Sequence, residues 1–326
     1  MRFVQVNDIA SVASELAVAL RKRGHEVDLL YPRLYGAGLP PVWKLAVVPA
    51  RFADWVRVAW RLRTGNYDAV HIHYAYLGIV GLMARVPYVL HCHGDDVRDV
   101  SRRVWAPVIR LAIKRARHVY YSTPDLKETL MAIRPDAEFL PNPIDIERFR
   151  PQPLPDDADD VLVACALAEN KGVENILDAC RHLEEERPEI RVTAVAGGSG
   201  TAEADMLPNV LLLMHQPRAK LPQLMSRHRV IIGQVHQGAV GMVELEAMAC
   251  GRPVIAYFTY DEAYAEPPPF VVAHTGGEIA GAVTRLLDDP SECTAIGQRG
   301  HEWVERNHNA AQMAERVEQL AARHAR

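Results

Sequence analysis

A short segment around residue 245 carries the residues best suited to chemistry. Residues 238–255 read as a glycine loop, a short apolar helix, a glycine that ends the helix and a buried strand. Within the helix, Glu246 has Ala, Met and Cys neighbours, where a charge is costly unless another group hydrogen-bonds it. The amides of Gly241, Met242 and Val243 would lie free at the helix start, which suits an anion. A phosphate there and a diol on Glu246 would make a nucleotide-sugar site, whereas the alternative is a buried Glu246 that pairs with an arginine or a backbone amide.

The elements that must position such a site alternate strand and helix, which is the pattern of a doubly wound parallel sheet. Ligands of such sheets bind beyond the carboxyl ends of the strands. The first half predicts strands at 3–6, 27–30, 69–73, 87–91 and 118–122, a helix that ends near residue 23, and basic helices at 51–63 and 101–116. A second set of alternations begins at residue 161 and ends in amphipathic helices at 277–288, 290–306 and 310–325.

Four other motifs stand in order before the helix that carries Glu246. They are Tyr67–His73, Val89–Asp96, Pro141–Asp145 with Phe149 and Pro151, and Glu169–Val173. Together with Gly241 and the run 246–254, they resemble the signature of GT-B glycosyltransferases, and most closely the retaining family GT4, which includes sucrose and mannosyl transferases. The resemblance runs the length of the chain. It implies an α/β protein with the GT-B fold, in which two Rossmann-like, doubly wound parallel-sheet domains face one another across a cleft.

The resemblance also assigns roles on the donor side. The match at His93 implies a contact with the transferred sugar through the imidazole or the backbone carbonyl, and the alternative is a strand-end histidine that packs locally. Lys171 matches the lysine that pairs with the diphosphate, and Glu246 would hold the ribose diol. The other donor-binding residues that it implies are His215, Gln216, Gln237, Gly238, Gly241, Met242 and Val243.

Two positions depart from the family pattern. Ala166 stands where the family has an arginine that binds phosphate, and Gly238 stands where it has the first glutamate of an E-x7-E pair. Glu244 is a poor substitute, because it points about 200° around the helix from Glu246. The groups that could take the place of the missing first glutamate are Gln237, His236 and the backbone of Gly241. The pattern indicates a divergent subgroup, and a degenerate relative without catalysis is the alternative.

On the acceptor side, residues 7–11 stand where the family has a glycine-rich loop, although they contain no glycine. Ala10 and Ser11 are small enough for a phosphate or an acceptor to approach the backbone. The acceptor residues that we expect are Asp8, Ala10, Ser11 and Tyr74. Asp95 and Asp96 are expected to cap the next helix rather than bind a metal. The resemblance implies no metal, and no cofactor beyond the nucleotide-diphosphate sugar that acts as co-substrate.

Length and composition predict two domains, because 326 residues with 49% hydrophobic residues can bury two cores. Prolines and the acidic run 156–160 indicate a hinge. We expect an acceptor-side domain at 1–150, a donor domain at 151–305 and a helix at 306–326 that crosses back to the first domain. No long apolar run predicts a membrane span, and a strand directly after Met1 leaves no room for a signal peptide. Five cysteines without a CxxC pair indicate reduced thiols in a cytoplasmic protein.

Charge is unevenly divided between the two halves. Residues 1–150 hold 22 Lys and Arg against 15 Asp and Glu, a balance of +7, whereas the remaining residues have a balance of −11. Two helices of the first half combine Trp with Lys and Arg, which is typical of helices at a membrane interface. Their residues are Phe52, Trp55, Val56, Arg57, Trp60, Arg61 and Arg63, and Arg102, Arg103, Trp105, Arg110, Lys114, Arg115 and Arg117. The two readings are peripheral docking at the inner face of an anionic membrane and ordinary surface helices. We expect no nucleic-acid binding, because no motif for it occurs.

These observations predict a metal-independent, retaining glycosyltransferase that moves a sugar from a UDP- or GDP-sugar to a hydroxyl of a glycan or lipid-linked acceptor. No suitably placed side chain looks like an enzymatic nucleophile, so the resemblance implies a front-face displacement. Two alternatives stay open. A sugar-nucleotide 2-epimerase shares the fold, but its catalytic residues are not matched here. A binding protein with a decayed donor site is suggested by Ala166 and Gly238.

Overall fold

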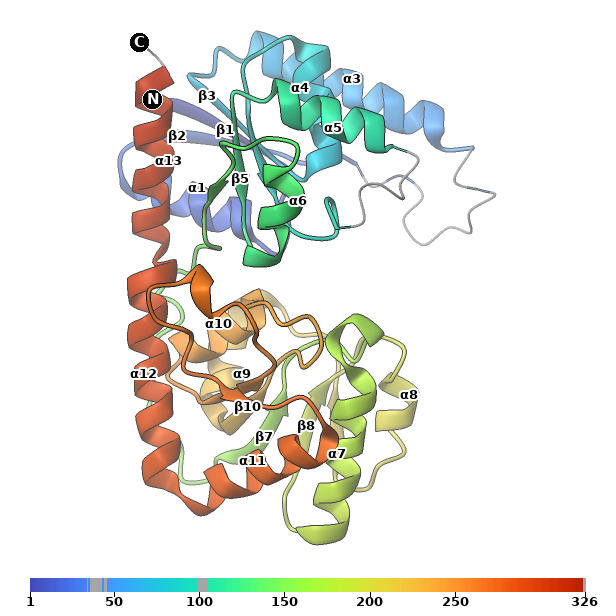
Figure 1. Ribbon diagram of the computed structural model, residues 1–326, viewed down its shortest axis with the longest axis vertical. Coiled ribbons are helices and arrows are strands. Elements are labelled where there is room, and N and C mark those ends of the chain that lie inside the picture. The colour runs from blue at the N-terminus through green and yellow to red at the C-terminus, as the bar shows by residue number, and fades with distance from the viewer. Residues whose placement is uncertain (34, 36–42, 44–45, 99–104, 325–326) are drawn as a thin grey trace. The chain divides into compact units, whose positions relative to one another are not determined.

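The computed structural model describes residues 1–33, 35, 43, 46–98 and 105–324 and divides into two compact units (Figure 1). The N-terminal unit holds Met1–Pro143 with Ala310–Arg326, and the C-terminal unit holds Ile144–Asn309. The predicted boundaries at 150 and 305 therefore differ from the observed ones. The physical reason is that Ile144 and Phe149 are buried in the C-terminal core, and the Ile144 amide donates to the His308 carbonyl at 2.7 Å.

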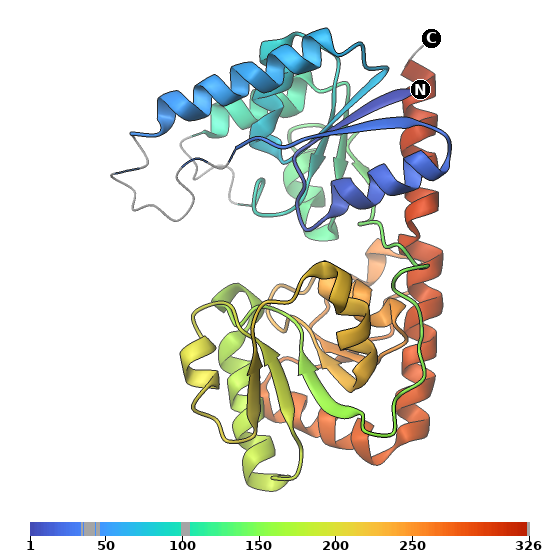
Figure 2. The same cartoon turned by 180° about the vertical axis from the view of Figure 1, so that it is seen from behind.

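The N-terminal unit is built on a parallel sheet of order β2-β1-β3-β4-β5-β6. Its strands are β1 (Arg2–Val6), β2 (Glu26–Leu30), β3 (Ala69–His73), β4 (Val89–Cys92), β5 (His118–Tyr121) and β6 (Glu138–Phe139). Its helices include α1 (Val12–Lys22), α3 (Val48–Thr64), α4 (Gly78–Ala84), α5 (Ala106–Arg115), α6 (Lys127–Met131) and α13 (Ala310–His324). Within this unit α13 packs against α1, as both views show (Figures 1 and 2).

The two faces of the central strands carry different side chains, because successive residues of a strand point to opposite faces. On one face, apolar residues such as Ile72 and Leu90 join the core formed with α3, α4 and α5. On the other face stand His71, His73 and His91, all buried. The sheet is therefore covered on both sides, as expected of a parallel sheet.

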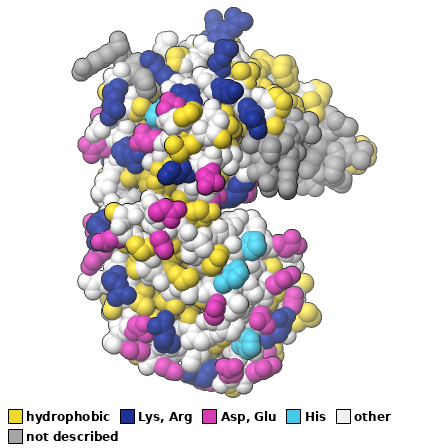
Figure 3. All heavy atoms as spheres, viewed as in Figure 1, with side chains coloured by type: hydrophobic (Ala, Val, Ile, Leu, Met, Phe, Trp, Pro, Cys, Tyr) yellow, Lys and Arg dark blue, Asp and Glu magenta, His cyan; other side chains and the backbone are white. Residues whose placement is uncertain are grey.

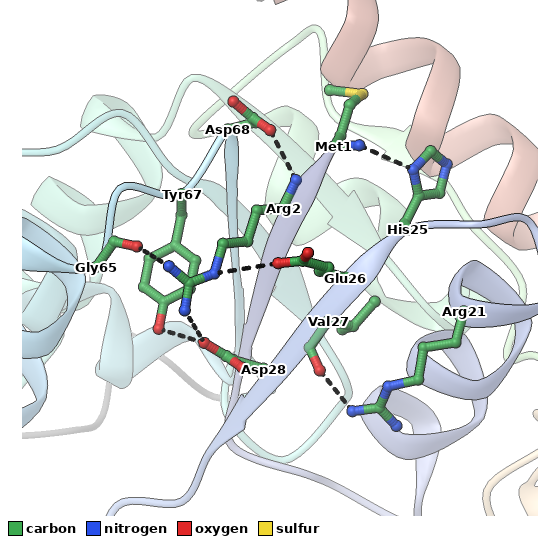
Figure 4. A network of polar contacts seen from close by, with 10 residues as sticks. All are labelled: Met1, Arg2, Arg21, His25, Glu26, Val27, Asp28, Gly65, Tyr67 and Asp68. Carbon is green, nitrogen blue, oxygen red and sulfur yellow. Dashed lines mark hydrogen bonds and ion pairs between the residues drawn. The ribbon is translucent and has the colours of Figure 1, made fainter.

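A polar network ties together the amino ends of these strands (Figure 4). The Arg2 guanidinium donates to the Gly65 carbonyl at 2.7 Å and pairs with the Asp28 carboxylate at 3.0 Å. The Tyr67 hydroxyl donates to the same carboxylate at 2.8 Å, and the Arg2 amide donates to Asp68 at 2.6 Å. These contacts tie the amino ends of β1, β2 and β3 together, whereas ligands of such sheets bind at the carboxyl edge.

The C-terminal unit repeats the design with a parallel sheet of order β12-β11-β10-β7-β8-β9. Its strands are β7 (Asp159–Val163), β8 (Val192–Val195), β9 (Val210–Leu213), β10 (His228–Ile232), β11 (Val254–Ala256) and β12 (Val271–Val272). Its helices are α7 (Val173–Glu186), α8 (Thr201–Ala204), α9 (Leu221–Arg227), α10 (Met242–Ala249), α11 (Gly276–Asp288) and α12 (Pro290–His308). Two parallel sheets flanked by helices confirm the predicted doubly wound architecture.

Several predicted elements need correction in their bounds. Helix α3 begins at Val48 rather than 51, with a proline in its first turn. Helix α5 begins at Ala106 rather than 101, and Arg102 and Arg103 of the second basic helix lie outside the described residues. All five cysteines are buried and free, as expected. None of the helices in the described part of the chain is long and apolar enough to cross a membrane.

Candidate active-site residues of the two units

The loop before α10 has a path that a side chain at residue 238 would disturb. Gly238 has φ +70°, in the left-handed region that favours glycine, and its carbonyl accepts from the Thr259 amide at 3.1 Å. A Cβ at this position would lie 2.5 Å from Thr259 Oγ1. The glutamate that the family pattern places here is therefore incompatible with this loop.

Gln234, at the end of β10, holds the same loop in place. Its side-chain Nε2 donates to the carbonyls of Ala239 and Tyr257 at 2.9 and 2.8 Å. Its Oε1 accepts from the amides of His236 and Gln237 at 3.0 and 2.6 Å. The candidate Gln237 is thus fixed through its backbone and keeps a partly exposed side chain.

The start of α10 is open to a ligand. Gly241 is extended at the N-cap, and no side chain of the described residues caps the helix. Gly241, Met242 and Val243 are partly exposed, while Glu244 turns inward and accepts from the Gln234 amide at 2.7 Å. The first amides of an uncapped helix carry a partial positive charge, so this end suits a phosphate.

Glu246 is 2% exposed and forms an ion pair with Arg218, whose Nη2 lies 2.6 Å from its Oε1. The buried pair with an arginine, which was the alternative for this residue, is therefore present in the structure. Arg148 and Arg218 both lie over the Phe149 ring, at 5.1 and 5.5 Å. Burial raises the pKa of Glu246 to about 7, while Arg218 and Arg148 pull it down.

Lys171 ends a single turn directly before α7. Gly172 follows with φ +82°, and the Lys171 carbonyl accepts from the Val235 amide at 2.9 Å. These contacts place Lys171 beside the start of the glycine loop. Among the described residues, its ammonium forms neither a hydrogen bond nor an ion pair, so it is available to an anion. Ala166 is exposed and offers no cation.

His215 and Gln216 follow β9. His215 is exposed, and its Nδ1 lies 3.1 Å from the Gln216 carbonyl. Gln216 donates from its side chain to the Met214 carbonyl at 2.7 Å. Both side chains bond only locally among the described residues.

At the N-terminal unit, His93 belongs to a stack of imidazoles on β3 and β4. Its ring lies 5.1 Å from that of His73 and 4.4 Å from that of His91. Its Nε2 is 3.0 Å from His73 Nδ1, and its Nδ1 is 2.8 Å from Ser122 Oγ. Both ring nitrogens are therefore engaged by the protein.

A chain of hydrogen bonds joins these rings to Gln5 and Ser122. The Gln5 side-chain amide lies 2.7 Å from His73 Nε2, and a neutral imidazole donates from one ring nitrogen and accepts at the other. The Ser122 hydroxyl, which has a single proton, also donates to the Cys92 carbonyl at 3.1 Å. The backbone carbonyl of His93 is the group left to contact a ligand.

Burial keeps these histidines neutral. It lowers the pKa of His71 and of His93 to about 3, and it lowers the pKa of His73 and His91 well below the usual value. Neighbouring imidazoles add to the effect for His71, His73 and His91, because each would repel a second positive charge.

The same stack raises the question of a metal. Nitrogens of His71, His73 and His91 lie within 4.8 Å of one another. However, the rings of His71 and His91 are only 11° from parallel, and those of His71 and His73 only 26°. An imidazole lone pair lies in the ring plane, so stacked rings do not aim their lone pairs at one point, as tetrahedral ligation requires. The absence of a metal stays our prediction.

Asp96 holds the loop of His93 in place through hydrogen bonds to backbone amides. Its Oδ1 accepts from the amides of His93 and Gly94 at 3.0 and 2.9 Å, and its Oδ2 accepts from the Ala75 amide at 2.7 Å. Asp95 pairs with Arg98 at 3.0 Å. Backbone amides and an arginine thus occupy these adjacent carboxylates.

Backbone conformations that side chains rarely adopt gather at the expected acceptor positions. Asn7, Ala10, Ser11 and Tyr74 have φ of 70°, 48°, 65° and 93°. Strain of this kind is retained mainly at functional sites. Asp8 accepts from the amides of Ala13 and Ser14 at 3.0 and 3.3 Å, so it holds the start of α1.

Sequence reasoning missed several residues that shape both sites. They are Gln5, Ser122, His73, Arg148, Arg218 and Gln234. Gln5 lies in a strand without a motif, the motif Tyr67–His73 assigns no role to His73, and the partners of Glu246 lie far from it in sequence. Only the location of Ser122, Arg148 and Arg218 near strand ends or motifs could have suggested them.

Comparison with known proteins identifies the family of this chain. Residues 9–148 match the family Glycosyltransferase Family 4, and residues 145–303 match Glycosyl transferases group 1. D-inositol 3-phosphate glycosyltransferase 2 of Catenulispora acidiphila is 28% identical over 289 residues, which cover 74% of this chain and 67% of that protein. D-inositol 3-phosphate glycosyltransferase of Kineococcus radiotolerans is 25% identical over 363 residues, which cover 87% and 83%.

Solved structures share the fold. Sucrose-phosphate synthase from Thermosynechococcus elongatus superposes with a TM-score of 0.75 at 19% identity, covering 99% of this chain and 98% of that one. HepE from Anabaena, in complex with UDP-glucose, superposes with a TM-score of 0.72 at 15% identity, covering 99% of both. With two family matches that together span residues 9–303, this chain belongs to the GT4-like family of GT-B glycosyltransferases.

Proposed function

We propose that this glycosyltransferase binds a nucleotide-diphosphate sugar in its C-terminal unit and transfers the sugar, with retention, to a hydroxyl of an acceptor bound by the N-terminal unit. The observation that carries the donor assignment is the start of α10, which no side chain of the described residues caps, together with Lys171, whose backbone carbonyl is bonded to the loop that leads to α10. Both offer positive charge to a diphosphate. The HepE structure contains UDP-glucose, which makes UDP-sugars the first donors to test.

The reaction would proceed by front-face displacement. The bond from the anomeric carbon to the phosphate oxygen breaks, and the acceptor oxygen bonds to that carbon from the same face. The departing phosphate oxygen takes the acceptor proton. Lys171 and the α10 amides would stabilise the charge on that phosphate, and the His93 carbonyl would face the transferred sugar. Glu246 would hold the ribose diol while Arg218 balances its charge.

Isothermal calorimetry with UDP, UDP-sugars and GDP-sugars, with and without EDTA, tests this proposal. We expect saturable binding of one nucleotide series that EDTA leaves unchanged, and transfer to an acceptor with the anomeric configuration kept. Binding of none of them would favour a decayed donor site. Formation of epimerised sugar nucleotide without an acceptor would favour the 2-epimerase alternative.

We also propose that the acceptor lies at an anionic membrane surface. Val48, Phe52, Val56 and Trp60 stand four residues apart along α3 and are 45–62% exposed. This spacing places them on one side of the helix. Figure 3 shows hydrophobic and basic side chains next to one another on the N-terminal unit. An apolar stripe beside arginines is the arrangement of interfacial helices.

Sedimentation with phosphatidylglycerol vesicles tests the membrane proposal. Each basic residue near such a surface contributes about 1 kcal/mol, and 0.1 M salt screens it over about 10 Å. Trp60→Ser with Arg61→Gln should therefore weaken vesicle binding and leave nucleotide binding unchanged. Arg57 is kept, because it pairs with the buried Asp54 carboxylate at 2.7 Å. Wild-type protein that ignores these vesicles at low salt would point to an acceptor in solution.

A further inference from the structure

We infer that a cavity beside α3 binds the apolar part of the acceptor, and that the acceptor is an amphiphile with an anionic group. The inference rests on the proposed function and specifies its acceptor. The cavity lies within the N-terminal unit and has a volume of about 450 Å³. Pockets of about 300–1,000 Å³ hold most small-molecule ligands.

The lining of this cavity is mainly aromatic and aliphatic. Phe52 and Trp55 come from α3, Ile79 from α4, and Tyr76 and Trp105 from the turns that precede α4 and α5. The Trp55 ring lies 6.4 Å from that of Tyr76 and 6.3 Å from that of Trp105. Aromatic and aliphatic walls of this kind bury a hydrocarbon chain or a flat ring well.

Two arginines add positive charge to the lining. Arg33 donates to the Tyr35 hydroxyl at 3.0 Å, and Arg51 donates to the Tyr35 carbonyl at 2.7 Å. Neither guanidinium forms an ion pair with a carboxylate among the described residues, although the Asp54 carboxylate accepts from the Arg33 backbone amide at 2.7 Å. Guanidinium groups beside an apolar cavity complement a phosphate or carboxylate that carries an apolar tail.

The cavity is connected to the His93 loop through a short chain of contacts. Asp96 accepts hydrogen bonds from the amides of both His93 and Ala75. Tyr76, the next residue, lines the cavity, and its ring lies 5.2 Å from that of Tyr74. The wall of the cavity at Tyr76 is therefore joined, through Ala75 and Asp96, to the loop that carries His93.

Binding of dodecyl phosphate, kept below its micellar concentration and measured by calorimetry, tests the inference. We expect saturable binding that Ile79→Trp, which fills the cavity, weakens at least tenfold. Phe52→Ala is a second variant at a half-exposed position that the fold tolerates, and it should weaken binding several-fold. Arg33→Gln with Arg51→Gln should weaken dodecyl phosphate at least tenfold, because a hydrogen bond to a charged group contributes about 1.5–3 kcal/mol.

The matched control is Trp60→Ser, on the same helix but outside the cavity lining, which should leave dodecyl phosphate binding unchanged. Equal affinity for dodecyl maltoside would overturn the anionic part of the inference. Unchanged binding in Ile79→Trp, or binding of vesicles without binding of the monomeric amphiphile, would overturn the cavity. Protein that binds a UDP-sugar but no dodecyl phosphate refutes only the cavity, whereas the reverse result refutes only the donor assignment.

Discussion

The two sheets bury titratable groups near their carboxyl edges, and the two sets have opposite chemistry. In the N-terminal unit, four imidazoles lie against one another and are neutral, because burial and mutual repulsion lower their pKa values. In the C-terminal unit, Glu246 lies against Arg218 and burial raises its pKa to about 7. The same architecture thus buries a neutral cluster in one unit and a charged pair in the other.

Acidification should produce the largest effect, because it should change the stability of the two units in opposite directions. A histidine whose folded pKa lies below its unfolded value near 6.5 stabilises the fold fully above that value and loses the stabilisation as pH falls below it. Between pH 7 and pH 5, His71 alone should cost about 2 kcal/mol, and His73 and His91 should add to the loss. Protonation of Asp96, whose pKa burial raises, offsets part of it.

Glu246 should have the reverse effect over the same range. Its folded pKa of about 7 lies above the ordinary 4.5, so the folded protein takes up a proton on acidification, and the C-terminal unit gains about 2 kcal/mol. Hydrogen exchange of peptides from β3 and α10, at pH 7 and pH 5, should show opposite changes in protection. His71→Phe, which removes one buried base, should reduce the loss in β3. Parallel changes in the two peptides would contradict the comparison.

Breaking the charged pair should be the next largest effect. Glu246→Ala leaves Arg218 mostly buried without its partner, so we expect the free energy of unfolding to fall by about 3–5 kcal/mol. Denaturant unfolding measures this, with Glu302→Ala on the exposed face of α12 as the control. Glu246→Gln keeps the shape and should cost less, while nucleotide affinity still falls by about 1–3 kcal/mol. Unchanged nucleotide affinity in Glu246→Gln would remove the ribose role and leave a structural ion pair.

Lys171, whose ammonium has no partner among the described residues, should show a selective effect on binding. Lys171→Ala should weaken UDP or GDP by about 1.5–3 kcal/mol and leave the bare nucleoside almost unaffected, because only the diphosphate meets the ammonium. Calorimetry with both ligands measures the difference, and Lys127→Ala, an exposed charge in the other unit, is the control. Equal losses for nucleoside and nucleoside diphosphate would place Lys171 away from the phosphates.

The smallest effect concerns the glycine that replaces the family glutamate. Gly238→Ala should lower the free energy of unfolding by about 1–2 kcal/mol, because an L side chain is strained at φ +70°. Gly277→Ala, where an added Cβ meets nothing within 4 Å in α11, should be neutral or stabilising. Thermal melting compares the two variants. Equal melting temperatures would show that the loop can take the path of the usual family members.

Much of the donor site could be predicted from the sequence because its signals are local. The glycine loop, the apolar helix and the helix-ending glycine follow one another within a single segment, so the open start of α10 needed no tertiary information. The alternation of strands and helices likewise predicted both parallel sheets. Asp96 was expected to cap a helix. In the structure it connects two loops instead, because its amide partners include Ala75 at the end of a neighbouring strand.

Tertiary structure alone decided which groups remain available. The sequence predicted that His93 follows a strand. Only the pairing of the strands brings His73 and Ser122 within hydrogen-bond distance of its two ring nitrogens. For Glu246, the alternative was a pair with an arginine or a backbone amide. In the structure its partner is Arg218, which follows another strand. The unit boundary moved to Ile144 because packing, rather than the proline-rich composition, decides where a domain begins. Local sequence determines elements and motifs, whereas the partners of a buried polar group depend on contacts between residues far apart in the chain.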